Sequence, residues 1–264
     1  MSCYRKALKC FSQNEPSLLK KIKAAFWFRI KQSWICDLDA AFEQEGMSDI
    51  LALHPFIYYM CRMHAFMAVG EDLALRQKRI VEHYRFMHRH FSFEQIQALF
   101  DRGVTLVAFD LEGRQVEVLL QYDHRMRFEG QLSLKLIVDR EEAYYIHFLF
   151  SDNTIWIGGI QGMKGFLELN KWFTKQTSGL RPQNFLYYCL TLLAQKLKID
   201  SIQGISSHAH VYQNEEKSMQ KIAFSYDAFW EELGGAPSDS DWFGLPVVYP
   251  RKSLEAIGSK KRGQ

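Results

Sequence analysis

The apolar residues of this chain first change their period at Gly103. Before this glycine they recur every three or four residues, as in amphipathic helices. After it, short runs rich in β-branched and aromatic residues alternate with turns of Asp, Glu, Gly and Arg. These runs comprise residues 104–109, 116–120, 132–138, 144–150 and 154–161. The sequence therefore predicts helices followed by a meander of antiparallel strands.

One more strand, residues 201–206, is predicted after two helical segments. Because a helical connection separates it from strand 154–161, we expect these two strands to be parallel. The predicted fold class is α+β, with a helical N-terminal region (residues 1–100) followed by a mixed, mostly antiparallel sheet with flanking helices (residues 101–264). No Pro-, Gly- or Ser-rich linker divides the chain, so we expect one compact unit.

Charge and cysteine content limit the classes of function. Of the 264 residues, 33 are Lys or Arg and 30 are Asp or Glu, a balance that does not favour nucleic acid as a partner. The five cysteines are scattered without the spacing of a zinc site, and we expect them to be reduced. The N-terminus meets charges within a few residues, and no window reaches the roughly 18 apolar residues of a membrane span. We therefore expect a cytoplasmic protein.

Residues 17–36 are predicted to form a basic helix. It contains five Lys or Arg residues and no acidic residue between positions 20 and 31, and its apolar residues recur every four positions: Leu18, Ile22, Phe26, Ile30 and Trp34. We expect this apolar stripe to pack on the core, with the basic residues forming a solvated face. The alternative is a helix that lies on an anionic surface and makes the protein peripheral at the inner membrane.

The sharpest chemical signal is residues 154–165, where a predicted strand ends in a glycine-rich loop before a helix. Backbone N–H groups that glycines leave bare, near a helix N-terminus, suit an anionic ligand. Glycine at the end of a strand can equally serve backbone geometry alone, and Arg181 before the next helix can clamp phosphate or form a surface ion pair. The predicted cofactor-binding residues are Gln161, Gly162, Lys164, Gly165 and Arg181.

Candidate acid–base residues follow strand 201–206. His208 and His210 are alternate residues, so in an extended chain their side chains point to the same side. Tyr212 and Glu129 are further candidates by residue type. No third ligand is evident beside the two histidines, and the histidines of the predicted helix 76–91 lack the i, i+4 spacing of a zinc-binding helix. We therefore expect no metal.

Several motifs together resemble the VirK/YbjX family of Gram-negative bacteria. They lie at residues 157–162 (IGGIQG), 179–182 (GLRP), 210–212 (HVY), 226–235 (YDAFWEELGG) and 259–262 (SKKR), with weaker ones at 79–84 and 128–132. The resemblance covers about residues 76–262. It implies an association with virulence and with tolerance of antimicrobial peptides and envelope stress, without an established reaction or a catalytic residue that can be carried over.

The predicted order of elements is also similar to the fold of the GNAT acyltransferases. In that fold, amides of a glycine loop after a long strand hold the pyrophosphate of an acyl-coenzyme A. The strict Arg/Gln-x-x-Gly-x-Gly/Ala signature is absent here, and an extra helix is inserted after the loop. The similarity implies acyl-coenzyme A or a similar acyl carrier as donor, and an amine or hydroxyl group as acceptor.

Two functions follow from these observations. The first is a GNAT-like acyltransferase, in which His208, His210, Tyr212 or Glu129 acts as acid or base. The second is a non-enzymatic envelope-stress or regulatory protein that binds lipid or a protein partner through its basic helix. An open cleft between strands 154–161 and 201–206 at the glycine loop favours the enzyme, whereas a filled sheet favours the binding protein.

Overall fold

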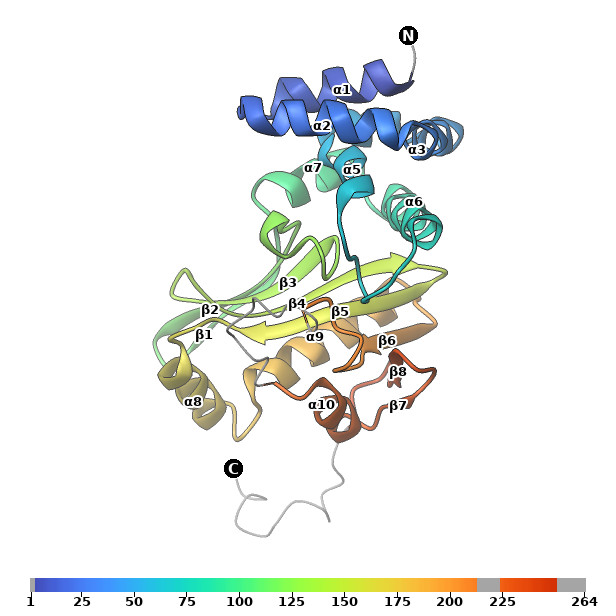
Figure 1. Ribbon diagram of the computed structural model, residues 1–264. Coiled ribbons are helices and arrows are strands. Elements are labelled where there is room, and N and C mark those ends of the chain that lie inside the picture. Colours follow the sequence, from blue (N-terminus) through green and yellow to red (C-terminus); the bar gives the residue numbers. More distant parts are fainter. Residues whose placement is uncertain (1–2, 213–223, 251–264) are drawn as a thin grey trace.

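A computed structural model of the chain describes residues 3–212 and 224–250 (Figure 1). Helices occupy the chain up to residue 101: α1 (Cys3–Asn14), α2 (Leu18–Ile30), α3 (Gln32–Gln44), α4 (Ser48–Leu53), α5 (Phe56–Tyr59), η1 (Met60–Arg62), α6 (Leu73–His90) and α7 (Phe93–Asp101). Three later helices are α8 (Leu167–Gln176), α9 (Pro182–Lys196) and α10 (Tyr226–Glu232), and a short turn, η2, covers His124–Met126. In Figure 1 the early helices lie above the sheet and α8, α9 and α10 lie below it.

The sheet has eight strands in the order β1-β2-β3-β4-β5-β6-β8-β7. The strands are β1 (Val104–Leu111), β2 (Arg114–Gln121), β3 (Leu132–Val138), β4 (Glu141–Ser151), β5 (Thr154–Gly162), β6 (Ser201–Ile205), β7 (Ala236–Pro237) and β8 (Trp242–Leu245). Only β5 and β6 are parallel neighbours, and all other pairs are antiparallel. The predicted α+β class, the meander and the parallel pair are confirmed.

Three two-residue turns set the register of the meander. The turns are Glu112-Gly113, Asp139-Arg140 and Asp152-Asn153, and each joins a pair of neighbouring antiparallel strands. All six residues have positive φ angles, between 50° and 81°. Such turns follow the natural twist of the strands, and Gly, Asn and Asp adopt them readily. The turn chemistry seen in the sequence therefore fixes which residues of adjacent strands are paired.

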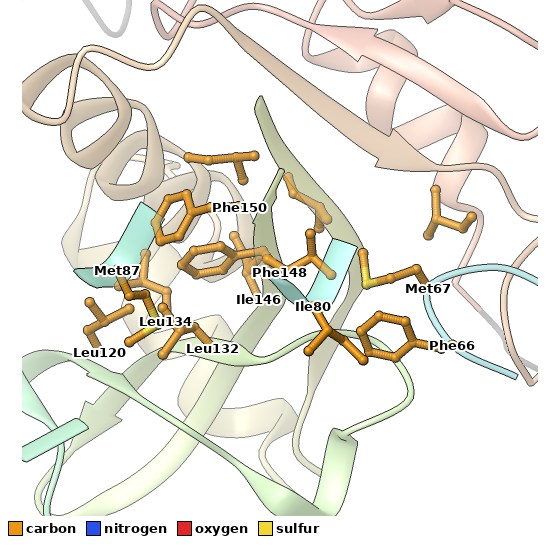
Figure 2. Packing of buried hydrophobic residues seen from close by; sticks show 14 of the residues in the cluster. Phe66, Met67, Ile80, Met87, Leu120, Leu132, Leu134, Ile146, Phe148 and Phe150 are labelled. Atoms are coloured by element: carbon orange, nitrogen blue, oxygen red, sulfur yellow. The ribbon is translucent and has the colours of Figure 1, made fainter. Parts of the chain in front are cut away.

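The core beneath the early helices joins α6 to the middle of the sheet. Figure 2 shows Phe148 and Phe150 of β4 close to Ile80 and Met87 of α6. His83 of α6 is also buried, and its Nδ1 accepts a hydrogen bond of 3.1 Å from the backbone N–H of Phe150. Ile80 and Met87 pack by apolar contact, which is not directional. The hydrogen bond of His83 is directional, and it joins α6 to β4 at Phe150.

Two expectations about the N-terminal region are wrong. The helix predicted over residues 17–36 is two helices, because the chain turns at Lys31 (φ −100°, ψ 33°), and its apolar stripe is exposed except for Trp34. The buried residues of α2 are instead Ala24 and Phe28. Cys3 and Cys36 form a disulfide between α1 and α3, so these two cysteines are not reduced. The redox argument for a cytoplasmic location no longer applies.

No helix in the described part of the chain combines the length and apolar character that crossing a bilayer requires. The basic segment 259–262, one of the family motifs, lies outside the described residues.

Substitution of Trp230 tests the packing of α10. The indole is fully buried, its Nε1 donates to the carbonyl of Ile205 at 2.7 Å, and a Cβ added at Gly204 would lie 2.6 Å from the ring. Trp230→Ala should reduce the free energy of unfolding by about 3–5 kcal/mol, measured by urea denaturation. Trp230→Phe, which keeps an aromatic ring but loses the hydrogen bond, should cost less. An unchanged midpoint in Trp230→Ala would contradict the packing.

Acid should destabilise the protein through its buried histidines. Burial lowers the pKa of His83 to about 3, from an ordinary value of 6.5. Below about pH 6.5 the unfolded chain therefore binds a proton that the folded protein does not, so stability falls as the pH decreases toward 3. We expect a slope of about 1.4 kcal/mol per pH unit from this residue.

The variant His83→Gln should lose less stability than wild type as the pH falls from 6 to about 4. Chemical denaturation at each pH measures this difference. His88→Gln, at an exposed position of the same helix, is the matched control for removing an imidazole. Equal slopes for wild type and His83→Gln would show that His83 is protonated in the folded state.

Candidate functional site

The register of β3, β4 and β5 places polar residues together on one face of the sheet. Ser133 is paired with His147, and Lys135 is paired with Tyr145. Across the next pair of strands, His147 is opposite Gly159 and Tyr145 is opposite Gln161. Directly paired residues point to the same face of a sheet. A row of polar side chains therefore crosses three strands, and Ser133, Lys135, Tyr145 and His147 are all buried.

The segment before β3 crosses closely over β4 and β5, and glycines lie at the points of contact: Gly130 in the segment itself, and Gly158 and Gly159 in β5. A Cβ added at Gly130 would lie 2.6 Å from the backbone nitrogen of Phe148, and one at Gly158 would lie 2.1 Å from the carbonyl oxygen of Glu129. At Gly159 it would lie 2.5 Å from the carboxyl carbon of Glu129. Real Cβ atoms do not approach so closely, so these positions require glycine. Gly158 and Gly159 of β5 thus make room for Glu129. The sequence, by contrast, predicts that the glycines of residues 154–165 form part of a site for an anionic ligand.

Glu129, His210 and Tyr226 form a buried chain of hydrogen bonds. Oε1 of Glu129 lies 3.0 Å from Nε2 of His210, and both side chains are only 2% exposed. The hydroxyl of Tyr226 lies 3.1 Å from the same nitrogen. Nδ1 of His210 accepts from the backbone N–H of Tyr212 at 3.4 Å, so in the neutral ring Nε2 carries the proton that faces Glu129.

Burial governs the charge of this chain of groups. It raises the pKa of Glu129, and the hydrogen bond and charge of His210 offset only part of that shift. Burial, followed by the charge of Glu129, raises the pKa of Tyr226 well above its usual value. The second carboxyl oxygen of Glu129 has no hydrogen-bond partner among the described residues. A buried carboxyl with a raised pKa beside a histidine is a candidate for proton transfer.

A second polar cluster lies beside the first and is held by charge pairing. Nζ of Lys135 lies 2.7 Å from Asp123 and 3.3 Å from Glu142, and the lysine side chain is 6% exposed. Burial works against the charge of Asp123, but hydrogen bonds from Arg125 and Lys135 hold its pKa far below the usual range. These charges are paired, so this cluster favours a structural role.

His147 belongs to the second cluster through its neighbour Ser133. The serine hydroxyl is hydrogen-bonded to Nδ1 of His147, whereas Nε2 has no partner among the described residues. Burial lowers the pKa of His147 to about 3, so the imidazole is neutral at pH 7.

The predicted acid–base residues are only partly brought together. Glu129 and His210 are in contact, and the ring of Tyr212 lies 5.6 Å from that of His210. His208 is separate: its side chain is 63% exposed and lies 3.4 Å from Asp241. The expected convergence of the two histidines is wrong, because β6 ends at Ile205 and the chain turns before His208.

Sequence analysis missed Tyr226 and Lys135. Tyr226 opens one of the family motifs, but its contacts with His210 and Ile160 join residues 16 and 66 positions away, so no local pattern indicated them. Lys135 did carry one, because Leu132–Val138 alternates Ser and Lys with apolar residues inside a run that reads as a buried strand. Among the described residues, no group of three potential metal ligands is found.

The predicted cofactor-binding residues spread over two places. Gln161 accepts a hydrogen bond of 2.8 Å from Tyr145, and a Cβ at Gly162 would lie 2.7 Å from the ring of Tyr144. Lys164 and Gly165 are exposed in the turn before α8, where Gly165 has a φ angle of +92°. Arg181 lies elsewhere, at the start of α9, where its guanidinium contacts Glu232 and Asn184.

The space where β5 and β6 separate is filled. The two strands pair only over Thr154–Ile157 and Ser201–Gly204. Farther along β5, the hydroxyl of Tyr226 takes the place of a strand partner, accepting from the N–H of Ile160 at 3.3 Å and lying 3.4 Å from its carbonyl oxygen. By the criterion stated for the two functions, this filling favours the binding protein.

A groove opens instead between α8 and the start of α9. Its volume is about 740 Å³, and its lining consists of Tyr144, Asn170, Lys171, Thr174, Lys175, Ser178, Gly179, Arg181, Pro182 and Gln183. Burial raises the pKa of Tyr144 to about 12, and the charge of Arg181 offsets part of the shift.

Substituting Glu129 tests whether its buried carboxyl titrates. Because its pKa is raised in the folded protein, the stability that the neutral carboxyl provides is lost as the pH rises above about 4.5. Glu129→Gln keeps an acceptor for His210 and cannot ionise. The free energy of unfolding of Glu129→Gln, relative to that of wild type, should therefore increase with pH by up to about 1.4 kcal/mol per pH unit.

Denaturation of both proteins between pH 4 and about 8 measures this difference. Glu141→Gln, at an exposed position of β4, is the control for removing a carboxylate. A difference that does not change with pH would show that the pKa of Glu129 is not raised in the folded protein.

Comparison with known proteins gives a family and two relatives. The family model described as "Protein of unknown function (DUF535)" matches residues 15–264. The chain is 27% identical over 216 residues to "Uncharacterized protein YbjX" of Escherichia coli K12 and 32% identical over 192 residues to an uncharacterized protein of Haemophilus influenzae. These alignments cover 72% and 71% of this chain but only 62% and 64% of the relatives. No solved structure matches.

The family match also corrects one expectation about its extent. The motifs indicated a resemblance from residue 76 onward, whereas the match begins at residue 15 and includes α2.

Proposed function

This chain belongs to the family described as "Protein of unknown function (DUF535)", and we propose that it binds a phosphorylated ligand of the acyl-coenzyme A class. The membership agrees with the resemblance to the VirK/YbjX family that its motifs carry. The observation that supports the proposal is the groove between α8 and α9, whose lining includes Lys171, Lys175 and Arg181 but no acidic residue. Three cations around one groove favour an anionic ligand.

The cations of the groove are available to a ligand. Lys175 makes no ion pair within residues 3–212 and 224–250, and Lys171 is held only by an exposed contact of 2.8 Å with Glu168. Arg181 contacts Glu232, and both side chains are more than 40% exposed. Exposed pairs of this kind contribute little energy, so a phosphate group can displace the carboxylates.

The dimensions and walls of the groove agree with a small-molecule ligand. Its volume of about 740 Å³ is within the range of about 300–1,000 Å³ typical of such sites. The first turn of α9, at Pro182 and Gln183, borders the groove and adds the positive end of a helix dipole. Tyr144 supplies an aromatic wall on the side nearest the sheet.

Acyl transfer is the second candidate function, and the raised pKa of Glu129 favours it. In this scheme an acceptor amine or hydroxyl attacks the thioester carbonyl of the donor, and the C–S bond breaks. The second carboxyl oxygen of Glu129, which has no partner among the described residues, takes the proton of the acceptor and returns it to the departing thiolate. Nε2–H of His210 holds the carboxyl group in place.

The arrangement differs from the GNAT scheme in where the donor binds. Because Tyr226 fills the space between β5 and β6, we place the donor phosphates in the α8–α9 groove and not at Gly162 or Lys164. A protein that binds without catalysis is the simpler proposal. In the cell, we propose a role in tolerance of antimicrobial peptides and envelope stress, as the VirK/YbjX resemblance implies. The cytoplasmic location expected from the sequence stays a proposal.

Calorimetric titration tests the groove as the ligand site. Coenzyme A, acetyl-coenzyme A, long-chain acyl-coenzyme A and pyrophosphate are titrated into the full chain. We expect binding of the coenzymes, weakened at least about tenfold in the double variant Lys171→Ala/Lys175→Ala, because charge-assisted hydrogen bonds to phosphate are lost. Gly162→Val is not a clean test, since its side chain would collide with Tyr144.

Two single variants locate the site. Lys196→Ala, in the last turn of α9, is the matched control for removing a lysine from this helix pair, and Lys164→Ala reports on the glycine loop. Weaker binding in Lys164→Ala alone would place the ligand at the glycine loop, and no heat with any ligand would remove the proposal. Glu129→Gln should retain binding, so acetyl transfer that persists in this variant would exclude its role in catalysis.

A further inference from the structure

Helix α2 presents an apolar face to solvent. Its exposed large side chains, with their exposed fractions, are Leu18 (72%), Leu19 (61%), Ile22 (58%), Phe26 (60%) and Ile30 (54%). These are five of the twelve large hydrophobic side chains that are exposed in the described part of the chain. At about 100° per residue they fall within an arc of about 120°, which is the width of a face that normally packs on a core.

The opposite side of α2 is firmly attached to the protein. Phe28 is fully buried, and its ring lies 5.7 Å from that of Phe11 and 6.3 Å from that of Tyr58. Ser17 caps the start of the helix by accepting from the N–H of Lys20. In Figure 1, α1 and α2 form the outermost layer, above the other helices and the sheet. The exposed face is therefore preformed and held outward by packing.

Positive charge accompanies the apolar face. The sequence from Leu18 to Lys31 contains Lys20, Lys21, Lys23, Arg29 and Lys31 and no acidic residue. Nζ of Lys20 lies 3.2 Å from Glu15, but the lysine side chain is exposed, so this ion pair is weak. By helical position, Arg29 lies within the apolar arc and Lys23 at its margin. On an anionic membrane surface, cations of such a helix contact the lipid phosphates, and its apolar side chains contact the acyl chains beneath them.

We propose that α2 lies flat on an anionic phospholipid bilayer, with Leu18, Ile22, Phe26 and Ile30 inserted among the acyl chains and the lysines on the phosphates. Charge decides against the other occupants of such a face. A second copy of the chain would bring Lys21, Lys23 and Arg29 of one helix near the same cations of the other, which is unfavourable. This proposal does not depend on the ligand groove, since α8 and α9 lie on the other side of the sheet from α2 in Figure 1.

Vesicle flotation with the full chain tests the proposal. Vesicles of phosphatidylcholine alone are compared with vesicles that also contain phosphatidylglycerol. Wild-type protein should float with the anionic vesicles, and its binding should weaken as salt is added. Ile22→Asp/Phe26→Asp should reduce the partition coefficient by more than about tenfold, because two inserted side chains are lost. Lys21→Gln/Lys23→Gln should reduce it about fivefold for each lysine.

A matched control and a second measurement complete the test. Leu192→Asp changes a side chain of α9 that is 46% exposed, and it should leave vesicle binding unchanged. All four substituted residues of α2 are solvent-accessible, so their variants should melt at the wild-type temperature. Equal binding to neutral and anionic vesicles, or none to either, would overturn the proposal. A dimer in analytical ultracentrifugation that Ile22→Asp/Phe26→Asp abolishes would assign the face to a second copy instead.

Discussion

The position of the Glu129 carboxyl group against Gly159 of β5 determines how the segment before β3 meets the segment after β6 and helix α10. Glu129 precedes β3, yet its carboxyl group rests where a side chain of β5 would otherwise stand. From there it binds His210, which follows β6, and His210 binds Tyr226 of α10. Segments from four parts of the chain therefore converge on a position that only glycine permits. A larger residue at Gly159 would displace Glu129 and leave His210 buried without its acceptor.

This convergence has an energetic cost that the protein tolerates. Burial disfavours the charged form of Glu129, and one of its oxygens has no partner within the described residues. The neighbouring cluster behaves differently, since Asp123 and Lys135 compensate each other at 2.7 Å. A paired buried charge fixes structure, whereas an incompletely satisfied one is retained where proton transfer or a switch is useful. That contrast is the reason for assigning chemistry to Glu129 and His210 and not to Lys135.

The two surfaces proposed for binding lie on opposite sides of the sheet. α2 belongs to the outer helical layer, and the groove lies beside α8 and α9 (Figure 1). If α2 rests on a bilayer, the groove faces away from it and stays accessible to ligands in solution. Both surfaces are basic, but they differ in kind. α2 offers a broad apolar face with cations near it, whereas the groove is concave, lined by three cations and of small-molecule size.

The sequence by itself determined the local structure and hence most of the topology. Positive-φ turns such as Asp152-Asn153 fixed the meander, Ser92 and Gln95 form a capping box at the start of α7, and the helical connection before β6 gave the parallel pair. Each of these depends on neighbouring residues, so the pattern is visible in one dimension.

Only the tertiary structure decided which face of α2 is buried and which residue the paired glycines serve. Ala24 and Phe28 on one side, and Ile22 and Phe26 on the other, are all apolar, so periodicity does not choose between them. The aromatic partners that select Phe28 come from α1 and α5. Likewise, Gly159 accommodates a carboxyl group from thirty positions earlier in the chain. Contacts between distant segments leave no periodic trace, because they depend on how completed elements pack together.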